Sequence, residues 1–276
     1  CRLVDGRDEI TQRVDGVVDG VRDRARNVLG YCRLDGQVAV VTGSGQGSGR
    51  GIAWALADAG ARVVINARRQ ADLEETASGI EDRGSTALIV TGDIRDFSES
   101  LAKQAVDHFG KIDIWVNNVG GSDDKNVHAL VDTSDETFRS MLELNLTSAF
   151  QGCKAAASRM GDGGAIINIT SGAGTRGSPM TGPYAAAKAG LINLTQTLAL
   201  ELAEQGIRVN CVSPGPVVTE AYRQVLGIED KLDELARTIP LGRTGTPEDI
   251  APAVVYLASS ASSWMTGQDI VINGGL

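Results

Sequence analysis

From residue 37 onward, short apolar runs rich in β-branched residues alternate with longer stretches in which apolar residues recur at helical spacing. The apolar runs lie at 37–42, 62–66, 86–91, 113–116, 165–169, 207–212 and 269–272, and the helical patterns lie near 48–59, 70–83, 98–109, 135–160, 182–205 and 247–259. Uniformly apolar runs are typical of strands buried on both faces, and strand–helix alternation builds a parallel sheet. The pattern therefore predicts an α/β fold with a doubly wound parallel sheet of about seven strands and helices on both faces.

Two segments stand outside this alternation. In residues 1–32 several valines recur at helical spacing, but Gly16 and Gly20 each weaken a helix by about 1 kcal/mol. We predict a poorly ordered N-terminal appendage there and a single domain over residues 33–276. The other segment, 216–246, is polar and helical and follows the sixth strand. Because an insertion at the carboxyl end of a strand lies over the ligand crevice of such a sheet, we predict a substrate lid.

Composition limits the classes of partner. The 276 residues carry a formal net charge of −9, which argues against nucleic acids and anionic membrane surfaces, because both attract clustered Lys and Arg. No apolar run reaches the ~18 residues of a membrane span, and no apolar signal segment is visible near residue 1. We predict no metal site, unpaired thiols and a cytoplasmic chain. The cysteines and histidines are scattered without metal-ligand spacing: Cys1, Cys32, Cys153, Cys211, His108 and His128.

The first strand runs directly into a glycine-rich segment, Thr42–Gly49, and then into a helix. Glycines at this junction let a pyrophosphate approach the helix N-terminus, where unpaired N–H groups and the helix dipole favour an anion. The spacing is T-G-x-x-x-G-x-G, and the absence of a following Gly-Lys-Ser/Thr excludes a P-loop NTPase. A flexible turn without function is the alternative. The position of the glycine segment between the first strand and the first helix of an α/β chain favours a Rossmann-type dinucleotide site.

The end of the second strand bears on which dinucleotide is bound. A carboxylate there accepts hydrogen bonds from both ribose hydroxyls of NAD and repels the 2′-phosphate of NADP. The sequence has Ala67 at that position, followed by Arg68 and Arg69, and a guanidinium can bind a phosphate through two hydrogen bonds. The alternative is that both arginines are solvated, since Gln46 in the glycine segment adds no second positive charge. The sequence favours NADP(H), with NAD(H) possible.

Three residues carry the candidate chemistry. Tyr184 and Lys188 are four residues apart on one predicted helix and are therefore adjacent on one face. A fixed ammonium stabilises a phenolate and lowers the phenol pKa toward neutrality. Ser171 follows the fifth strand, at the sheet edge where ligands bind, and its hydroxyl can orient a carbonyl. A Tyr-x-x-x-Lys pair alone is common on ordinary helices, so its position after the serine and the glycine segment is what favours catalysis.

With these motifs in this order, residues 34–276 resemble the short-chain dehydrogenases/reductases. The family's Asn-Asn-Ala-Gly strand end appears with Val119 in place of alanine. The matching motifs are the glycine segment Thr42–Gly49, the strand end Asn117–Gly120, the tetrad Asn145, Ser171, Tyr184 and Lys188, the turn Pro214-Gly215 with Thr219, and the segments 239–249 and 266–275.

The resemblance implies a role for each of these residues. Tyr184 would act as the general acid or base, Ser171 would position the substrate oxygen, and Lys188 would hold the nicotinamide ribose and depress the Tyr184 pKa. Asn145 would support a water-linked proton relay, although a satisfied polar residue in a helix is the alternative. Asp93 would contact the adenine, or would simply cap the helix that follows. The implied cofactor contacts are Gly43, Ser44, Gln46, Gly47, Ser48, Gly49, Arg68, Asp93, Ile94, Asn118, Gly120, Tyr184, Lys188, Pro214, Gly215, Val217 and Thr219.

The expected function is an oxidoreductase that interconverts a secondary alcohol and a carbonyl. The resemblance is greatest to 3-oxoacyl-carrier-protein reductases and bacterial hydroxysteroid dehydrogenases. A non-catalytic dinucleotide-binding sensor or scaffold on the same fold is the alternative, and the intact tetrad argues against it. Family members form dimers or tetramers through the helices corresponding to 135–160 and 182–205, so we expect a homotetramer or homodimer that binds a small alcohol or carbonyl substrate and neither nucleic acid nor membrane.

Overall fold

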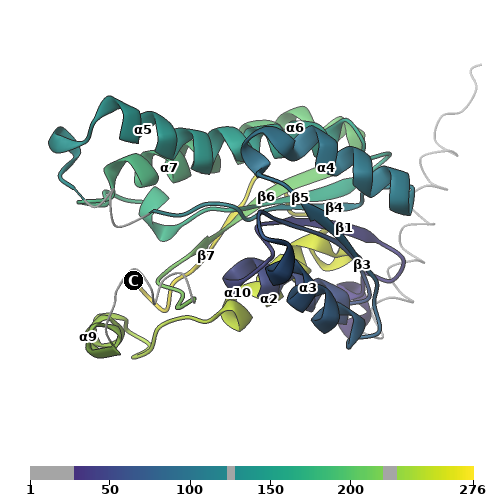
Figure 1. Cartoon of the computed structure of the whole chain (residues 1–276), viewed down its shortest axis with the longest axis horizontal. Helices are drawn as coiled ribbons and strands as arrows, with labels where there is room; N and C mark the ends of the chain where they lie inside the picture. The colour runs from purple at the N-terminus through teal and green to yellow at the C-terminus, as the bar shows by residue number, and fades with distance from the viewer. Residues whose placement is uncertain (1–27, 123–127, 220–228) are drawn as a thin grey trace, which may run out of the picture.

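Seven parallel strands form one sheet in the computed structural model of the chain, which describes residues 28–122, 128–219 and 229–276 (Figure 1). The strand order is β3-β2-β1-β4-β5-β6-β7, so the chain reverses its direction of winding between β1 and β4. The carboxyl ends of β1 and β4 therefore flank a crevice of the kind in which such sheets bind ligands. The strands are β1 (Val38–Thr42), β2 (Arg62–Ala67), β3 (Ala87–Thr91), β4 (Ile114–Asn117), β5 (Gly164–Ile169), β6 (Ile207–Pro214) and β7 (Asp269–Ile272). The predicted fold class is confirmed.

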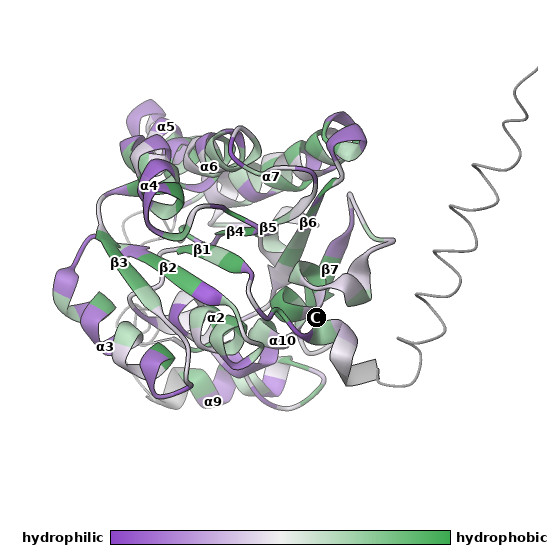
Figure 2. Ribbon diagram, turned by 90° about the vertical axis from the view of Figure 1, so that its right-hand side faces the viewer, coloured by the Kyte–Doolittle hydropathy of each residue, from purple (hydrophilic) through white to green (hydrophobic). Residues whose placement is uncertain are grey.

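Helices cover both faces of the sheet, and each face has its own apolar core (Figure 2). The helices α2 (Gly47–Asp58), α3 (Gln70–Glu81) and α10 (Pro247–Ala258) pack on one face, and α4 (Ile94–Phe109), α6 (Ser148–Ala157) and α7 (Gly182–Glu201) pack on the other. Strand residues alternate between the two cores: Val40 faces α4 and α6, whereas Val41 faces α2 and α10. Burial on both faces explains why these strands read as uninterrupted apolar runs.

The segment predicted as one helix over 135–160 is not continuous. It consists of α5 (Asp135–Leu142), one π-helical turn, η4 (Glu143–Thr147), and α6. A π turn places one extra residue in the helix, and such turns are frequent at functional sites. The residue at its centre is Asn145, which is fully buried. The interruption therefore lies at a predicted site residue.

The helix predicted over 98–109 begins earlier, at Ile94, because the Asp93 side chain accepts a hydrogen bond from Arg95 N and caps it. Residues 28–32 of the predicted appendage form a 3₁₀ helix, η1 (Val28–Cys32), and the Tyr31 carbonyl accepts a hydrogen bond of 3.1 Å from Ser260 Oγ in η7 (Ser260–Ser262). Residues 1–27 of that segment lie outside the described residues.

The predicted lid, 216–246, contains α9 (Glu229–Thr238), and its residues 220–228 lie outside the described part. The two ends of this segment are tied together, because Val218 N donates to Gly245 O and Gly245 N donates to Pro216 O, both at 2.9 Å. Within the described residues, none of the helices combines the length and the apolar content of a membrane span. Cys32, Cys153 and Cys211, the cysteines in that part of the chain, are unpaired.

Candidate active site

The glycine segment between β1 and α2 requires its glycines. Gly43 and Gly47 have φ angles of +64° and +55°, which residues with a side chain rarely adopt. A Cβ on Gly49 would overlap the carbonyl oxygen of Gly43, so the loop can fold back on the start of α2 only with glycine there. The glycines therefore allow the backbone of this segment to approach a bound ligand closely.

Side chains from three other elements hold this loop. Asn118 Nδ2 donates to the carbonyl oxygens of Thr42 and Gly43, at 3.0 and 3.2 Å. Thr76 Oγ1 donates to Ser44 O at 2.9 Å, and Arg50 donates to Gly45 O. Ser44 itself is fully buried, and its hydroxyl bonds to the backbone of Val41 and Asn66. The Ser44 side chain, predicted to contact the cofactor, thus braces the loop from inside.

The N-terminus of α2 offers a site for an anion. Within the described part of the chain, the N-cap residue Gln46 makes no side-chain capping hydrogen bond, so the first N–H groups of the helix are left for another acceptor. Ser48 follows in the first turn and is partly exposed. From the other side, Thr219 approaches Gly47: a Cβ on this glycine would lie 3.0 Å from Thr219 Cγ2. These residues fit the pyrophosphate of a dinucleotide.

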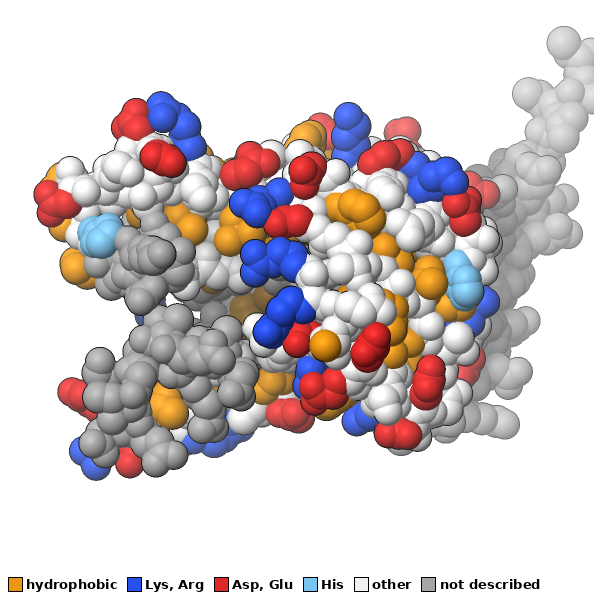
Figure 3. Space-filling model, in the orientation of Figure 1, with side chains coloured by type: hydrophobic (Ala, Val, Ile, Leu, Met, Phe, Trp, Pro, Cys, Tyr) orange, Lys and Arg blue, Asp and Glu red, His pale blue; other side chains and the backbone are white. Residues whose placement is uncertain are grey.

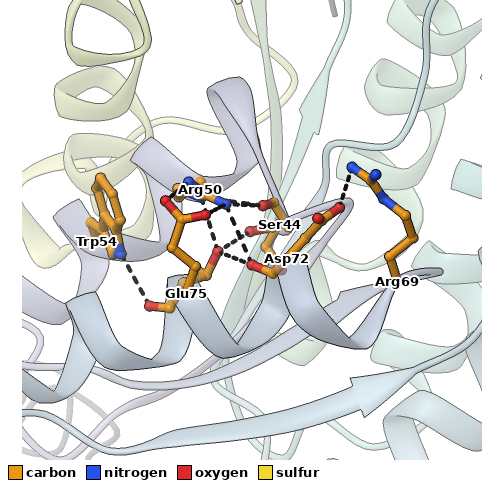
Figure 4. Close-up of polar contacts among 8 residues, drawn as sticks. Ser44, Arg50, Trp54, Arg69, Asp72 and Glu75 are labelled. Carbon is orange, nitrogen blue, oxygen red and sulfur yellow. Dashed lines mark hydrogen bonds and ion pairs between the residues drawn. The ribbon is translucent and has the colours of Figure 1, made fainter. Parts of the chain in front are cut away.

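Charged residues gather at the end of β2 (Figure 4). Arg69 forms an ion pair with Asp72 at 2.6 Å, and a Cβ on Gly45 would lie 2.9 Å from Asp72 Cβ and 3.1 Å from Ala67 Cβ. Asp72 was not among the predicted site residues. Its place in the first turn of α3, close after Arg68 and Arg69, could have indicated a charged contact at this end of the site. The Asp72 carboxylate therefore lies near Ala67, the position at which NAD-binding sites have an acidic residue. The ion pair with Arg69 compensates the negative charge of Asp72.

Behind this cluster, Arg50 binds Glu75 through both guanidinium ends, at 2.5 and 2.8 Å, and so connects α2 to α3 (Figure 4). The Trp54 indole donates to Thr76 O at 3.0 Å from the same face of α2. The two helices thereby form a rigid wall beside the glycine loop. Arg50 was not among the predicted site residues, because an arginine within a helix gives no signal of its partners.

The predicted adenine contact, Asp93, is the N-cap of α4 and forms an ion pair with Arg95 at 2.6 Å. The hydrogen bond from Arg95 and, more weakly, the charge of Arg68 lower the Asp93 pKa. Asp93 and Arg68 therefore lie at the same end of the site. The side chain of the neighbouring Ile94, the first residue of α4, is buried in the apolar core between α4 and the sheet, so its backbone rather than its side chain is available to a ligand.

Lys188, Tyr184 and Ser171 meet beyond the carboxyl end of β5. Lys188 is buried on α7, and its Nζ donates to Ile169 O at 2.9 Å and lies 5.7 Å from the centre of the Tyr184 ring. Burial lowers the Lys188 pKa to about 8. Burial also raises the Tyr184 pKa, and a hydrogen bond with Ser171 partly offsets that rise. The Ser171 hydroxyl accepts a hydrogen bond from Ala173 N at 3.1 Å, which fixes its orientation.

The direction of the Tyr184 pKa differs from the expectation. Sequence spacing predicts that the Lys188 ammonium lowers it, but desolvation of the phenol is the largest effect and raises it. The spacing of four residues correctly predicts that Tyr184 and Lys188 share a helix face. It does not determine the direction in which the Lys188 ammonium points. Lys188 Nζ is directed to the backbone of β5 rather than to the phenol oxygen.

Asn145 joins this group through the loop after β4. Its Oδ1 accepts from Gly121 N at 2.8 Å, and its Nδ2 donates to Gly121 O at 3.0 Å and to Met141 O at 3.1 Å. A Cβ on Gly120 would lie 2.7 Å from both Asn145 Oδ1 and Lys188 Nζ, so this position admits only glycine. The side chain of Asn145 thus holds a loop of the site by its backbone.

The turn after β6 completes the crevice. Gly215 N donates to Ile272 O at 2.8 Å, and a Cβ on Gly215 would lie 2.7 Å from Asn273 Cα, which places Pro214 and Gly215 firmly against β7. Val217 lines a small cavity at the base of the predicted lid, together with Leu241 and Ile250. On the surface, the molecule is hollowed between the α5–α7 layer and α9, and basic side chains gather beside the hollow (Figure 3).

Known proteins share this architecture over nearly the whole chain. The family model described as enoyl-(acyl carrier protein) reductase matches residues 43–276. A 3-oxoacyl-[acyl-carrier-protein] reductase of Vibrio cholerae is 38% identical over 246 residues, covering 88% of this chain and 98% of the relative. The 3beta-hydroxysteroid dehydrogenase 1 of Eggerthella lenta is 36% identical over 257 residues, covering 89% of this chain and 95% of the relative. The chain belongs to the short-chain dehydrogenase/reductase family.

A solved member of the family has the same fold. The crystal structure of a short-chain type dehydrogenase/reductase from Mycobacterium marinum superposes with a TM-score of 0.81 at 37% identity, covering 90% of this chain and 98% of that one. Membership makes the chain an oxidoreductase that acts on CH–OH or C=O groups with a nicotinamide dinucleotide. These comparisons give no support to the alternative of a non-catalytic sensor.

Proposed function

We propose that the chain is an NADP(H)-dependent oxidoreductase that interconverts a secondary alcohol and a carbonyl, with Tyr184 as the general acid or base. The observation that carries the proposal is the meeting of the Ser171 hydroxyl, the Tyr184 phenol and the buried Lys188 ammonium at the carboxyl end of β5. A carbonyl in the crevice can there accept hydrogen bonds from two hydroxyls at once. This arrangement stabilises the oxyanion that develops during reduction.

In this mechanism, each residue of the chain has a separate task. Ser171, oriented by Ala173 N, binds the substrate oxygen, and Tyr184 gives the proton to it or takes the proton from it. Lys188, whose Nζ is held at Ile169 O, would hold the nicotinamide ribose. When bound, the nicotinamide supplies or accepts the hydride. Lys188 is buried and Tyr184 is half-buried, which limits the access of water to the proton transfer.

The preference for NADP(H) is supported by the charges at the end of β2. No acid occupies position 67, and the nearby Asp72 carboxylate is compensated by Arg69. Arg68 is exposed at the same end of the site, where its guanidinium can bind a 2′-phosphate. A charge-assisted contact of this kind contributes about 1.5–3 kcal/mol, or roughly 10- to 150-fold in preference.

Cofactor choice can be measured directly. The kcat/KM for NADPH should exceed that for NADH by roughly 10-fold or more. The double variant Ala67→Asp/Arg68→Ile restores the carboxylate and removes the exposed guanidinium, and should reverse the order. Arg95→Ile is a matched control, because it removes an arginine near the same edge that is already paired with Asp93. A wild-type chain that prefers NADH would contradict this assignment.

For the substrate, we propose a partly hydrophobic 3-oxoacyl or hydroxysteroid-like compound. Two relatives are named for activities on these two classes. The described part of the lid contributes apolar residues above the crevice, and the small cavity at its base is lined mainly by apolar atoms. Assays of 3-oxoacyl thioesters, 3-ketosteroids and sugar lactones with NADPH, followed by the loss of its absorbance, would distinguish the classes. Turnover confined to lactones would contradict the proposal.

We also propose that the chain assembles into a homotetramer or homodimer. Ala155, Ala156 and Leu191, in the two helices expected to form the interface, are buried within the protomer. Other large apolar side chains on the same helices are exposed: Phe150 on α6 at 45% and Leu200 on α7 at 80%. Trp264 and Val271, near the edge strand β7, are exposed as well. Apolar groups of this size favour contact with a second copy.

A further inference from the structure

The loop after β4 carries a buried hydroxyl that the chain does not satisfy. Across residues 28–122, 128–219 and 229–276, Ser122 Oγ is the only buried side-chain nitrogen or oxygen atom without a hydrogen-bond partner. Leaving a buried polar group unpaired costs about 1–3 kcal/mol, so native proteins rarely retain one without a reason. The orphaned hydroxyl is therefore a candidate for binding a ligand.

Ser122 lies next to the most constrained part of the site. Both backbone polar groups of the preceding residue, Gly121, are bound by the Asn145 amide, at 2.8 and 3.0 Å. One residue earlier, Gly120 is enclosed by Asn145 Oδ1 and Lys188 Nζ. Since two residues span at most about 7 Å of extended chain, Ser122 lies within that reach of the glycine that contacts Asn145 and Lys188. The bidentate contact gives this loop segment a defined position.

Space is present on the ligand side of this loop. A Cβ built on Gly121 would meet no described atom within 4 Å, so the residue borders open space rather than a packed neighbour. Ser122 is partly exposed as a residue although its Oγ is covered. No hydrogen bond within the described residues holds the hydroxyl in that rotamer, so rotation about χ1 can direct it to a bound substrate whose oxygen supplies the missing partner.

We propose that Ser122 is a specificity-determining residue whose hydroxyl binds a second oxygen of the substrate, close to the reacting carbonyl. The proposal rests on the proposed carbonyl chemistry of Ser171 and Tyr184. With those two hydroxyls on the reacting oxygen, Ser122 binds a further acceptor, such as the ester or thioester carbonyl of a 3-oxo compound. The Asn145 amide acts through Gly121 as the positioning group for this contact.

The test compares substrates with one and two oxygens in Ser122→Ala, with NADPH as the reductant. For ethyl acetoacetate, which has a second carbonyl, kcat/KM should fall roughly 2- to 10-fold, the loss of one hydrogen bond. For 2-hexanone, which has only the reacting carbonyl, kcat/KM should stay within the error of the wild-type value. Ser122→Thr keeps the hydroxyl and should retain the preference for the 3-oxo ester.

Thermal stability gives a second, independent readout. Because the Ser122 hydroxyl has no partner to lose, Ser122→Ala should keep or raise the Tm. Ser98→Ala is the matched control: this buried serine on α4 donates to Ile94 O at 3.3 Å, so its loss should lower the Tm and leave the substrate ratio unchanged.

The outcomes separate this proposal from the proposed function. An unchanged substrate ratio in Ser122→Ala, an equal loss for both substrates, or a lowered Tm would overturn the role of Ser122 and leave the carbonyl chemistry standing. A wild-type chain that reduces neither compound would overturn the role of Ser122, and the proposed function falls with it only if 3-oxoacyl thioesters and 3-ketosteroids are not reduced either.

Discussion

The burial of the Lys188 side chain lowers the stability of the folded chain in order to build the site. Its ammonium is buried in α7, and the one hydrogen bond that the structure gives it in the described residues goes to Ile169 O, at 2.9 Å. A carbonyl oxygen compensates only part of the hydration that the ammonium loses, so burial lowers the Lys188 pKa to about 8. At neutral pH the buried Lys188 ammonium thus lowers the free energy of unfolding, and its burial serves the site rather than the fold.

This burial predicts how stability depends on pH. The Lys188 pKa is about 8 in the folded chain, against 10.5 for a lysine exposed to water. Between these values the unfolded chain binds more protons, so the free energy of unfolding rises with pH. The cost is fully present below pH 8 and is relieved above pH 10.5. Lys188→Met should remove this rise, which is on the order of 3 kcal/mol.

The prediction can be checked by urea unfolding of wild type and Lys188→Met in parallel from pH 7 to pH 10.5. The difference in unfolding free energy between the two chains should shift in favour of wild type as the pH increases. A difference that stays constant over this range would mean that Lys188 is not buried in its charged form.

At the residue scale, spacing along the sequence predicted geometry but not the direction of the Tyr184 pKa. Tyr184 and Lys188 share a helix face as expected, and Gly43, Gly47 and Gly49 form the tight loop. It could not give contacts that depend on side chains from distant segments. Asp72 approaches the glycine loop from α3, and Ser44 turns inward to β2; neither direction is encoded in local sequence.

At the element scale, periodicity located every strand of the sheet, because strands buried on both faces leave uninterrupted apolar runs. It did not reveal the π-helical turn at Asn145, because one extra residue barely changes the apolar pattern of a long helix. That turn coincides with the amide contacts to Gly121 and Met141. The local departure from regular geometry thus serves the site.

A second element-scale feature is how the end of α10 is stabilised. Arg208 on β6 is largely buried and donates to the carbonyl oxygens of Leu257, Ala258 and Ser259 and, at 2.8 Å, to Ser262 Oγ. A cation at a helix C-terminus binds the last carbonyls and interacts favourably with the helix dipole. The guanidinium therefore connects β6, α10 and η7 in place of a carboxylate partner.

Arg208→Met keeps the aliphatic stem but removes the guanidinium hydrogen bonds to the end of α10, where Leu257 O and Ser259 O keep Ser262 Oγ as a donor and Ala258 O does not. We expect a loss of about 1–3 kcal/mol, which corresponds to roughly 2–10 °C in Tm for a chain of this size. Arg139→Met is the control, because it removes an exposed ion pair with Asp135 and should change stability by less than about 1 kcal/mol. Differential scanning calorimetry measures both. Equal Tm values for Arg208→Met and wild type would show that water satisfies the carbonyls.

For the whole molecule, the exposed apolar residues on α6 and α7 predict assembly. Light scattering at micromolar concentration should give the mass of a tetramer or dimer of the 28.8 kDa chain. Leu200→Glu places a charge on the exposed part of α7 and should shift the mass toward the protomer. Leu241→Glu, at an exposed leucine before α10, is the matched control for an added charge. A wild-type chain that scatters as a protomer would contradict the proposed assembly.

The central claim is that the chain transfers hydride between a nicotinamide dinucleotide and a carbonyl, with Tyr184 delivering the proton. The most direct test supplies NADPH with both hydrogens on C4 of the nicotinamide replaced by deuterium to a panel of 3-oxo esters and 3-ketosteroids, and determines the mass of the product alcohol. We predict one deuterium on the carbinol carbon of the product. Tyr184→Phe, which keeps the ring and loses the hydroxyl, should form this product about 10²–10⁴-fold more slowly with little change in NADPH affinity. A product without deuterium, or Tyr184→Phe turnover equal to that of wild type, would contradict the account.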